Sequence, residues 1–534
     1  MRRHLPRLLA VGFALLGAPA LAAEATAEVK PVAPDPYALA AKIDQHLDGQ
    51  LKQHGVTPAP KAEDAEFLRR AMLDLNGRIP LPREVYDLAR EKSTHKRREL
   101  VNKLLDTPGY VNHFTNVNRH LFLPEASTNF EVAYFQVGFD AWMRKKLSEN
   151  TPYDKLARDL ITAQIGNRRE MYYNPYGGTE NPLAFFQAKE AKPENVAAAT
   201  AKIFLGIQIE CAQCHNHPFA RWSREQFWGT AAFFAGIERT QNNFYAPMRE
   251  IADRREIAIP NTDKVIQATF LDDKEPQWKF QTSSRVTFAE WMTAEDNPFF
   301  ARTAVNRIWA QLFGVGIVDP VDDFNDENKA SHPELLAELA KAFIAAKYDT
   351  KFMIRSITAT EAYQRTSAST DGSLSNARLY ARMPVKGMTG EQLFDSLATA
   401  VGYRDPFPRN QPGFFFGGNN PRFEFMTKFG TSGKPTEAQT SILQALMLMN
   451  GKFLADATSL DKSETLAAIV DAPFLETPKK IETLYLAVLG RAPRAEELSK
   501  LVKHIETGDP AKQKQRLGDV MWTLLNTVEF RVNH

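Results

Sequence analysis

The sequence has few cysteines, no excess of one charge and no long apolar run after its first residues. Two cysteines in 534 residues cannot form the disulfide framework of a small secreted domain. The 66 Lys and Arg residues nearly balance the 64 Asp and Glu residues, so the sequence indicates no nucleic-acid partner. Beyond residue 22 no run of about 18 apolar residues occurs, so we expect no transmembrane segment in the mature chain.

The composition is that of a folded protein. Hydrophobic residues make up 43% of the chain, and 35 Phe, 14 Tyr and 7 Trp residues supply surface to bury. The length suggests about two to four domains.

The first 22 residues have the order of a secretory signal peptide. A basic start is followed by a short apolar run over residues 8–16, and small residues precede a cleavage site near Ala22. We therefore expect a periplasmic or secreted protein. That compartment is oxidising, so the two cysteines need a chemical reason to be present.

The remaining chain predicts a mainly α fold, a multi-helix array with a small β-rich insert. Residues 23–60 are rich in Ala and Pro and indicate a tether with one short helix. Apolar residues at helical spacing then predict a helical domain over 61–239, which carries both cysteines. Clusters of β-formers predict two to four strands over 240–285. Helical patterns return over 286–534, interrupted by a loop-rich segment at 404–440.

Both cysteines lie in one motif, Cys211-Ala-Gln-Cys214-His215-Asn-His217. Cys-x-x-Cys-His is the attachment signature of c-type haem. Two thiols at this spacing reach the two vinyl groups of one porphyrin, and the adjacent His215 supplies an axial nitrogen to the iron. Because attachment takes place after export, the motif agrees with the signal peptide.

Other interpretations of the motif remain open. A zinc ion could use Cys211, Cys214, His215 and His217 as a closed four-ligand site, although most zinc sites draw their second pair of ligands from farther away. The two thiols could form a disulfide or a redox couple, or they could be a structural pair without a cofactor.

Residues around the motif also allow two readings. Several aromatic side chains follow the motif in the sequence. In one interpretation they enclose a porphyrin, and Arg221 and Arg224 pair with its propionates. In the other they belong to an ordinary hydrophobic core. The aromatic residues are Phe219, Trp222, Phe227, Trp228, Phe233 and Phe234. A second axial ligand is not identified by the sequence; the candidates by residue type are His113, His120, His332, Met447 and Met449.

Long motifs on both sides of the insert resemble a known family. FLRRAMLDLNGRIPLPREV at 67–85 and FLGIQIECAQCHNHPFARWSREQFWGTAAFFAG at 204–236 resemble its first domain. The second domain is matched by AEWMTAEDNPFFARTAVNRIWAQLFGVGIVDPVDDF at 289–324, SHPELLAELA at 331–340, ATEAYQRTS at 359–367 and RMPVKGMTGEQLFDSLATAVG at 382–402. The chain is similar to large exported proteins, abundant in planctomycetes, that have two tandem domains of unknown function and are often fused to cytochrome c-like modules.

The resemblance implies export and an association with cytochrome-like modules, but no reaction. No separate cytochrome module is visible here, so Cys211, Cys214 and His215 form the single haem-type signature. In the second domain Asp319, Asp322, Asp323, Asp326 and Glu327 could bind a hard cation. We favour a structural role instead, in which Asp322 or Asp323 caps a helix or pairs with Arg307, and Ser331 caps the helix that Pro333 opens.

The sequence thus predicts an exported helical protein with one covalent haem, acting in electron transfer or redox sensing with a redox partner. The alternative is a zinc-stapled or cofactor-free scaffold that binds an exported partner enzyme or a surface polymer. No H-E-x-x-H and no G-x-S-x-G motif occurs, and a catalytic role stays open because catalytic groups need not be adjacent in sequence.

Overall fold

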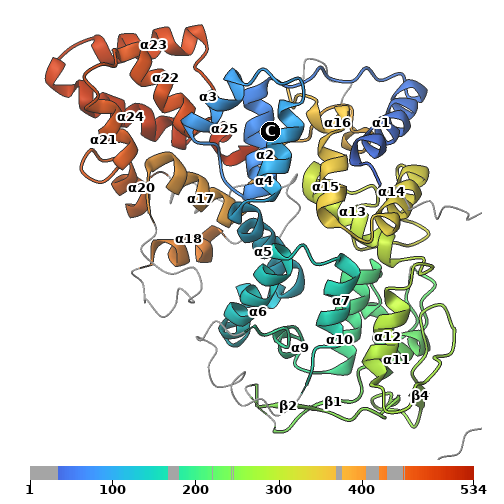
Figure 1. Cartoon of the computed structure of the whole chain (residues 1–534). Helices are drawn as coiled ribbons and strands as arrows, with labels where there is room; N and C mark the ends of the chain where they lie inside the picture. Colours follow the sequence, from blue (N-terminus) through green and yellow to red (C-terminus); the bar gives the residue numbers. More distant parts are fainter. Residues whose placement is uncertain are drawn as a thin grey trace, which may run out of the picture. The chain divides into compact units, whose positions relative to one another are not determined.

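In the computed structural model, helices make up most of the described residues (Figure 1). The structure describes residues 34–165, 180–218, 220–241, 243–244, 246–368, 376–404, 420–429, 449 and 451–534. The predicted signal peptide, Phe219 and Met447 lie outside these residues. The mainly α fold with small β elements is confirmed. No described helix is both long enough and apolar enough to span a membrane.

Seven helices open the described chain. They are α1 (Pro36–Gln53), α2 (Asp64–Asn76), α3 (Pro82–Arg90), α4 (Lys96–Leu105), α5 (Pro108–Phe122), α6 (Phe130–Ser148) and α7 (Tyr153–Ile161). Local chemistry sets several ends: the Asp35 side chain caps α1 and the Thr107 side chain caps α5, and a proline follows each cap. The predicted short helix of segment 23–60 is α1, which has 18 residues and buries Ile43 and Leu47.

A second group of short elements leads to the cysteine motif and the insert. It consists of α9 (Ala184–Ala188), α10 (Pro193–Thr200), a π-helix (Ala201–Leu205), a 3-10 helix (Glu210–Gln213) and α11 (Arg224–Ala232). Strands β1 (Ile237–Arg239) and β2 (Met248–Glu250) pair antiparallel, as do β3 (Glu256–Ala258) and β4 (Val265–Gln267). Strands β2, β3 and β4 lie within the predicted 240–285 insert, whereas β1 comes just before it.

The second half returns to helices. They are α12 (Ser284–Met292), α13 (Phe300–Phe313), α14 (Pro333–Ala345), α15 (Thr350–Thr358), α16 (Glu361–Gln364), α17 (Gly390–Val401) and α18 (Pro421–Phe429). The last are α20 (Lys452–Ala457), α21 (Glu464–Val470), α22 (Thr477–Val488), α23 (Ala495–Glu506), α24 (Gln513–Leu525) and α25 (Val528–Arg531). Strand β5 (Lys386–Gly387) pairs antiparallel with β6 (Val532–Asn533), which brings the C-terminal residues beside position 386.

Two large hydrophobic cores and one small cluster, of Leu51 and Ala381, lie within the described residues. The larger is built mainly from α1 to α16, whereas the smaller joins α17, α18 and the helices after position 450 to Leu73 and Ile79. Helix α2 therefore contributes to both cores: Phe67, Leu68 and Met72 pack in the first, and Leu73 packs in the second.

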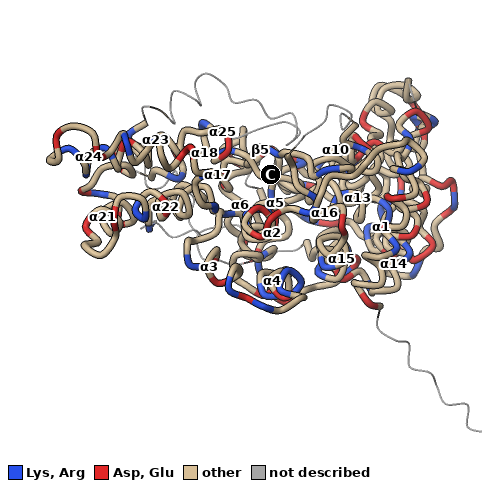
Figure 2. Tube along the Cα trace, turned by 90° about the horizontal axis from the view of Figure 1, so that it is seen from above, with Lys and Arg blue, Asp and Glu red and all other residues tan. Residues whose placement is uncertain are grey.

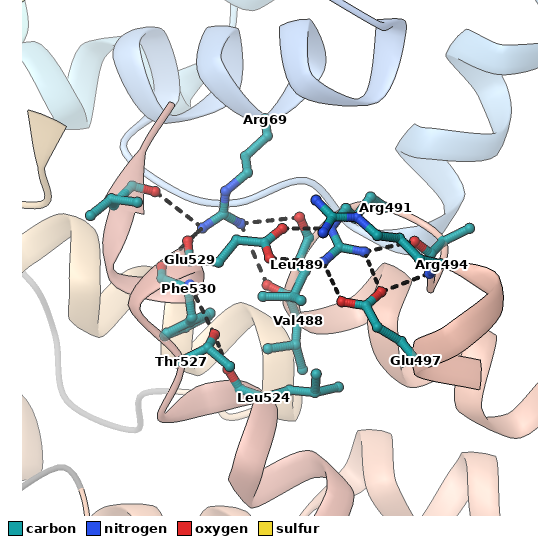
Figure 3. A network of polar contacts seen from close by, with 12 residues as sticks. Arg69, Val488, Leu489, Arg491, Arg494, Glu497, Leu524, Thr527, Glu529 and Phe530 are labelled. Carbon is teal, nitrogen blue, oxygen red and sulfur yellow. Dashed lines mark hydrogen bonds and ion pairs between the residues drawn. The ribbon is translucent and has the colours of Figure 1, made fainter. Parts of the chain in front are cut away.

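Buried polar contacts of α2 tie the two cores together. The Arg69 guanidinium, which is 1% exposed, donates to the carbonyl of Phe530 over 2.9 Å and to that of Glu529 over 3.2 Å (Figure 3). On the same helix the Asp74 carboxylate accepts hydrogen bonds from Lys386 Nζ (2.6 Å), Asn533 Nδ2 (2.7 Å) and the Tyr363 hydroxyl (2.7 Å). The buried Arg69 and Lys386 cations and the Asp74 carboxylate thus have polar partners where water is excluded.

Candidate functional site

A close backbone approach directs the chain into the cysteine motif. The π-helix Ala201–Leu205 ends at Gly206, whose φ of 68° lies in the left-handed region. A Cβ at this position would lie 2.6 Å from a Phe324 ring carbon and 2.7 Å from Thr303 Oγ1, so only glycine fits without a shift. Ile207 and Ile209 are then buried, which anchors the chain just before the motif.

The 3-10 helix Glu210–Gln213 places the two thiols. Cys211 is the second residue of this helix, and Cys214 is its C-cap residue. Ala212 between them is fully buried and faces the core, whereas both cysteines are free and exposed. The local structure therefore leaves both thiols accessible.

Helix α11 holds this segment in place. The carbonyl of Gln213 accepts hydrogen bonds from Trp228 Nε1 over 3.0 Å and from Arg224 Nε over 3.3 Å. The backbone N–H of Arg224 in turn donates to Asn216 Oδ1 over 2.9 Å. Contacts on both sides of His215 thus fix the backbone that carries it.

The two histidines of the motif are oriented differently. His215 is exposed, and its Nδ1 lies 2.7 Å from the carbonyl oxygen of Asn216. A carbonyl only accepts, so Nδ1 carries the proton and Nε2 presents a lone pair, which is the usual arrangement of a metal-ligating histidine. Nδ1 of His217 instead accepts from the Ala220 N–H over 2.9 Å, which places the proton of the neutral ring on Nε2.

This difference bears on the two cofactor predictions. The exposed thiols and the lone pair of His215 fit the attachment of a c-type haem. In the described part of the chain, no three His, Cys, Asp or Glu side chains gather into a group that could hold a metal ion. A zinc site of Cys211, Cys214, His215 and His217 would therefore need these side chains to move together.

The aromatic residues after the motif belong to the protein core. Trp222, Phe227, Trp228, Phe233 and Phe234 are all between 0 and 4% exposed. Phe227 packs against Trp228, Trp222 packs against Phe299, and Phe233 and Phe234 pack against Phe288. Phe233 also stacks on Phe270. These aromatic side chains therefore form part of the hydrophobic core, and they do not support the interpretation that they enclose a porphyrin.

The two arginines near the motif have protein partners. Arg221 lies over the Trp222 ring, with its guanidinium carbon 5.0 Å from the ring centroid, and Arg224 donates to the carbonyl of Gln213 as described above. The prediction that they pair haem propionates stays untested.

Four of the proposed second axial ligands have other surroundings. His113 is buried beside Gly77, and His120 Nε2 lies 2.7 Å from Glu391 Oε1. Nδ1 of His332 lies 3.0 Å from Ser331 Oγ. Met449 is 47% exposed and its carbonyl accepts from Trp522.

The acidic cluster near position 322 has a structural explanation. Asp322 Oδ2 lies 3.8 Å from Arg307 Nη2, in agreement with the predicted ion pair. The prediction that Ser331 caps α14 is wrong, because His332 is the N-cap residue and makes no side-chain capping bond. The Ser331 hydroxyl instead donates to the carbonyl of Ile317 over 3.2 Å and closes the preceding loop.

Comparison with known proteins gives two adjacent family matches. Residues 42–239 match PSCyt2, described as a protein of unknown function (DUF1549), and residues 284–414 match PSD1, described as a protein of unknown function (DUF1553). No curated protein and no solved structure matches the chain. The tandem arrangement that the sequence motifs predict is confirmed, and Cys211, Cys214 and His215 all lie within the first match.

Proposed function

We propose that this protein of two tandem domains of unknown function is exported and carries one c-type haem. Cys211 and Cys214 would hold the haem through thioether bonds, and His215 would ligate the iron. The haem, when bound, supplies one-electron transfer, so the protein would act in electron transfer or redox sensing in the periplasm or outside the cell. Export would follow from the signal peptide predicted for residues 1–22.

The orientation of His215 is the observation that supports this proposal best. The Nδ1–H donates to the carbonyl of Asn216 and leaves Nε2 as the ring atom for a metal. The two thiols that precede it are exposed, so an enzyme that attaches the haem has access to them. The partner that would exchange electrons with the protein is not identified by its residues.

The test is the visible spectrum of protein made together with haem-attachment machinery. We expect a Soret band that remains with the protein after acid–acetone extraction, because a thioether-linked haem is not extracted. Cys211→Ala and Cys214→Ala are expected to weaken this attachment, and His215→Ala to shift the absorption bands. His504→Ala is the matched control, since His504 is an exposed histidine in the last turn of α23.

Two results would contradict the proposal. One is a colourless protein with one zinc ion per chain by elemental analysis, which would favour the scaffold held by zinc. The other is a colourless protein without metal, in which Cys211→Ala changes stability only. Either result would remove electron transfer as the function.

A further inference from the structure

A basic cavity lies where the two family-matched segments meet. It is a shallow pocket: its empty space of about 220 Å³ includes open solvent, and the enclosed part has room for about one water molecule. Tyr37 of α1, residues of α4, Arg355 of α15 and Gln364 of α16 line it, and α15 contacts both α1 and α4. Helix α4 falls in the first matched segment and α15 in the second. Figure 2 shows the Lys and Arg residues along α4.

Arg97 gives this cavity a fixed positive charge. Its Nη2 atom donates to Asp64 Oδ1 over 2.9 Å and to the Ala62 carbonyl over 2.6 Å, and its Nη1 donates to Gln364 Oε1 over 3.3 Å. The same Asp64 carboxylate also pairs with Lys96 over 2.5 Å. One negative charge is therefore shared by two cations and does not neutralise the site.

The other two arginines of the cavity have no carboxylate partner among the described residues. Arg98 lies over the Tyr37 ring, with its guanidinium carbon 4.3 Å from the ring centroid. Arg355 Nε donates to Asn102 Oδ1 over 2.9 Å, and Asn102 Nδ2 donates to the Tyr37 hydroxyl over 3.3 Å. These contacts hold the planes of both guanidinium groups and leave Nη atoms to bind a ligand.

We propose that this cavity binds a small tetrahedral dianion, a phosphate or sulfate group, between Arg98 and Arg355. Three guanidinium groups and no acidic side chain line the cavity among the described residues, so a doubly charged anion is the matching ligand. Guanidinium groups recognise such oxyanions through paired hydrogen bonds. The pocket is open to solvent, so an ester that carries the group would extend out of it.

The proposal does not depend on the haem. A ligand held by α4 and α15 would join the two matched segments, and a ligand that binds only the folded state raises its stability. Binding is therefore expected to raise the melting temperature as well as to give a saturable calorimetric signal. These two readouts are independent of any redox activity.

The experiment is isothermal titration of the full chain with inorganic phosphate, inorganic sulfate, glycerol 3-phosphate and a sulfated monosaccharide, at ionic strength matched with chloride. We expect saturable binding that Arg98→Gln and Arg355→Gln each weaken at least tenfold. Arg355→Lys keeps the charge but loses the fork of donors, so we expect it to weaken binding as well. Arg302→Gln removes one positive charge from an exposed site on α13 and is the matched control.

Tighter binding of an inorganic ion would indicate a free ion as the ligand, and tighter binding of an ester would indicate a group on a larger molecule. The proposal fails if no saturable binding is seen with any of the four probes. It also fails if Arg302→Gln weakens binding as much as Arg355→Gln does, because the effect would then be one of net charge. Circular dichroism of each variant confirms that it folds.

Discussion

The strongest prediction concerns Asp74, whose carboxylate joins α2 to two distant parts of the chain. Oδ1 accepts from Lys386 Nζ and Asn533 Nδ2, and Oδ2 accepts from the Tyr363 hydroxyl. Asp74 is 2% exposed and Lys386 is 5% exposed. Asp74→Asn would remove the negative charge and leave one acceptor oxygen where the carboxylate has two.

The size of the effect follows from the buried charge that remains. After Asp74→Asn, Lys386 loses its carboxylate partner and keeps only neutral acceptors, among them the carbonyls of Leu312 and Gln311. Removing one member of a buried ion pair lowers the free energy of unfolding by about 3–5 kcal/mol. For a unit of roughly 500 residues the entropy of unfolding is about 1 kcal/mol per degree, so the melting temperature should fall by about 3–5 °C.

Differential scanning calorimetry measures this shift. Lys264→Met is the control, because it removes a surface ion pair with Glu225 in which the side chains are 67% and 64% exposed, and it should move the melting temperature by less than about 1 °C. The double variant Asp74→Leu/Lys386→Met removes both charges of this pair, so it should be more stable than Asp74→Asn. If Asp74→Asn shifts the melting temperature no more than Lys264→Met does, the argument from the buried pair is refuted.

Two further predictions concern Gly77 and the buried histidines. Gly77→Ala should lower the melting temperature more than Gly55→Ala. Both glycines have φ near +65 to +70°, but only at Gly77 would the new Cβ meet another side chain, with His113 Nδ1 at 2.6 Å. Equal shifts of the melting temperature would contradict this steric argument. Burial lowers the pKa of His113, His332 and His534 to about 4, from the unfolded value of 6.5. The neutral rings therefore contribute stability above about pH 6.5 that is lost as the pH falls toward 4, by up to about 3 kcal/mol for each ring. The His113→Asn variant should show a shallower fall of melting temperature between pH 7 and 4 than the wild type does, and an unchanged slope would contradict this assignment.

Much of the local structure could be predicted from short stretches of sequence. Thr107 and Pro108 begin α5, and Gly77 ends α2 in the left-handed conformation, as their residue types indicate. The strands of the insert also follow from their β-forming residues. Helix α18 is an exception, since the segment 404–440 was expected to be loop-rich. Asn420 and Pro421, which can mark a turn, here start a helix, with Asn420 Oδ1 accepting from the Phe423 N–H.

The cysteine motif has features that its sequence predicts and features that depend on the tertiary structure. Its residue types and spacing are local, and they alone predict a pair of thiols next to a histidine. Its surroundings are not local, because exposure of Cys211 and Cys214 depends on the burial of Ala212, and the orientation of His215 depends on a turn that α11 holds. The aromatic residues that follow could have walled a cofactor, and packing against the insert placed them in the core instead.

The basic cavity and the Asp74 network were missed by sequence reasoning. The consecutive basic residues at 96–98 are a signal for the first, but they are equally typical of a solvated helix face. Lys386 and Asp74 are 312 positions apart and carry no mark of their pairing.

The sequence by itself determined the helical character, most helix ends and the thiol–imidazole motif, because these depend on side chains a few residues apart. The tertiary structure decided which charges are buried in pairs, which arginines gather around a cavity and which motif atoms reach solvent. Such relations join residues from distant elements, and they are fixed only when the apolar faces of those elements pack into shared cores.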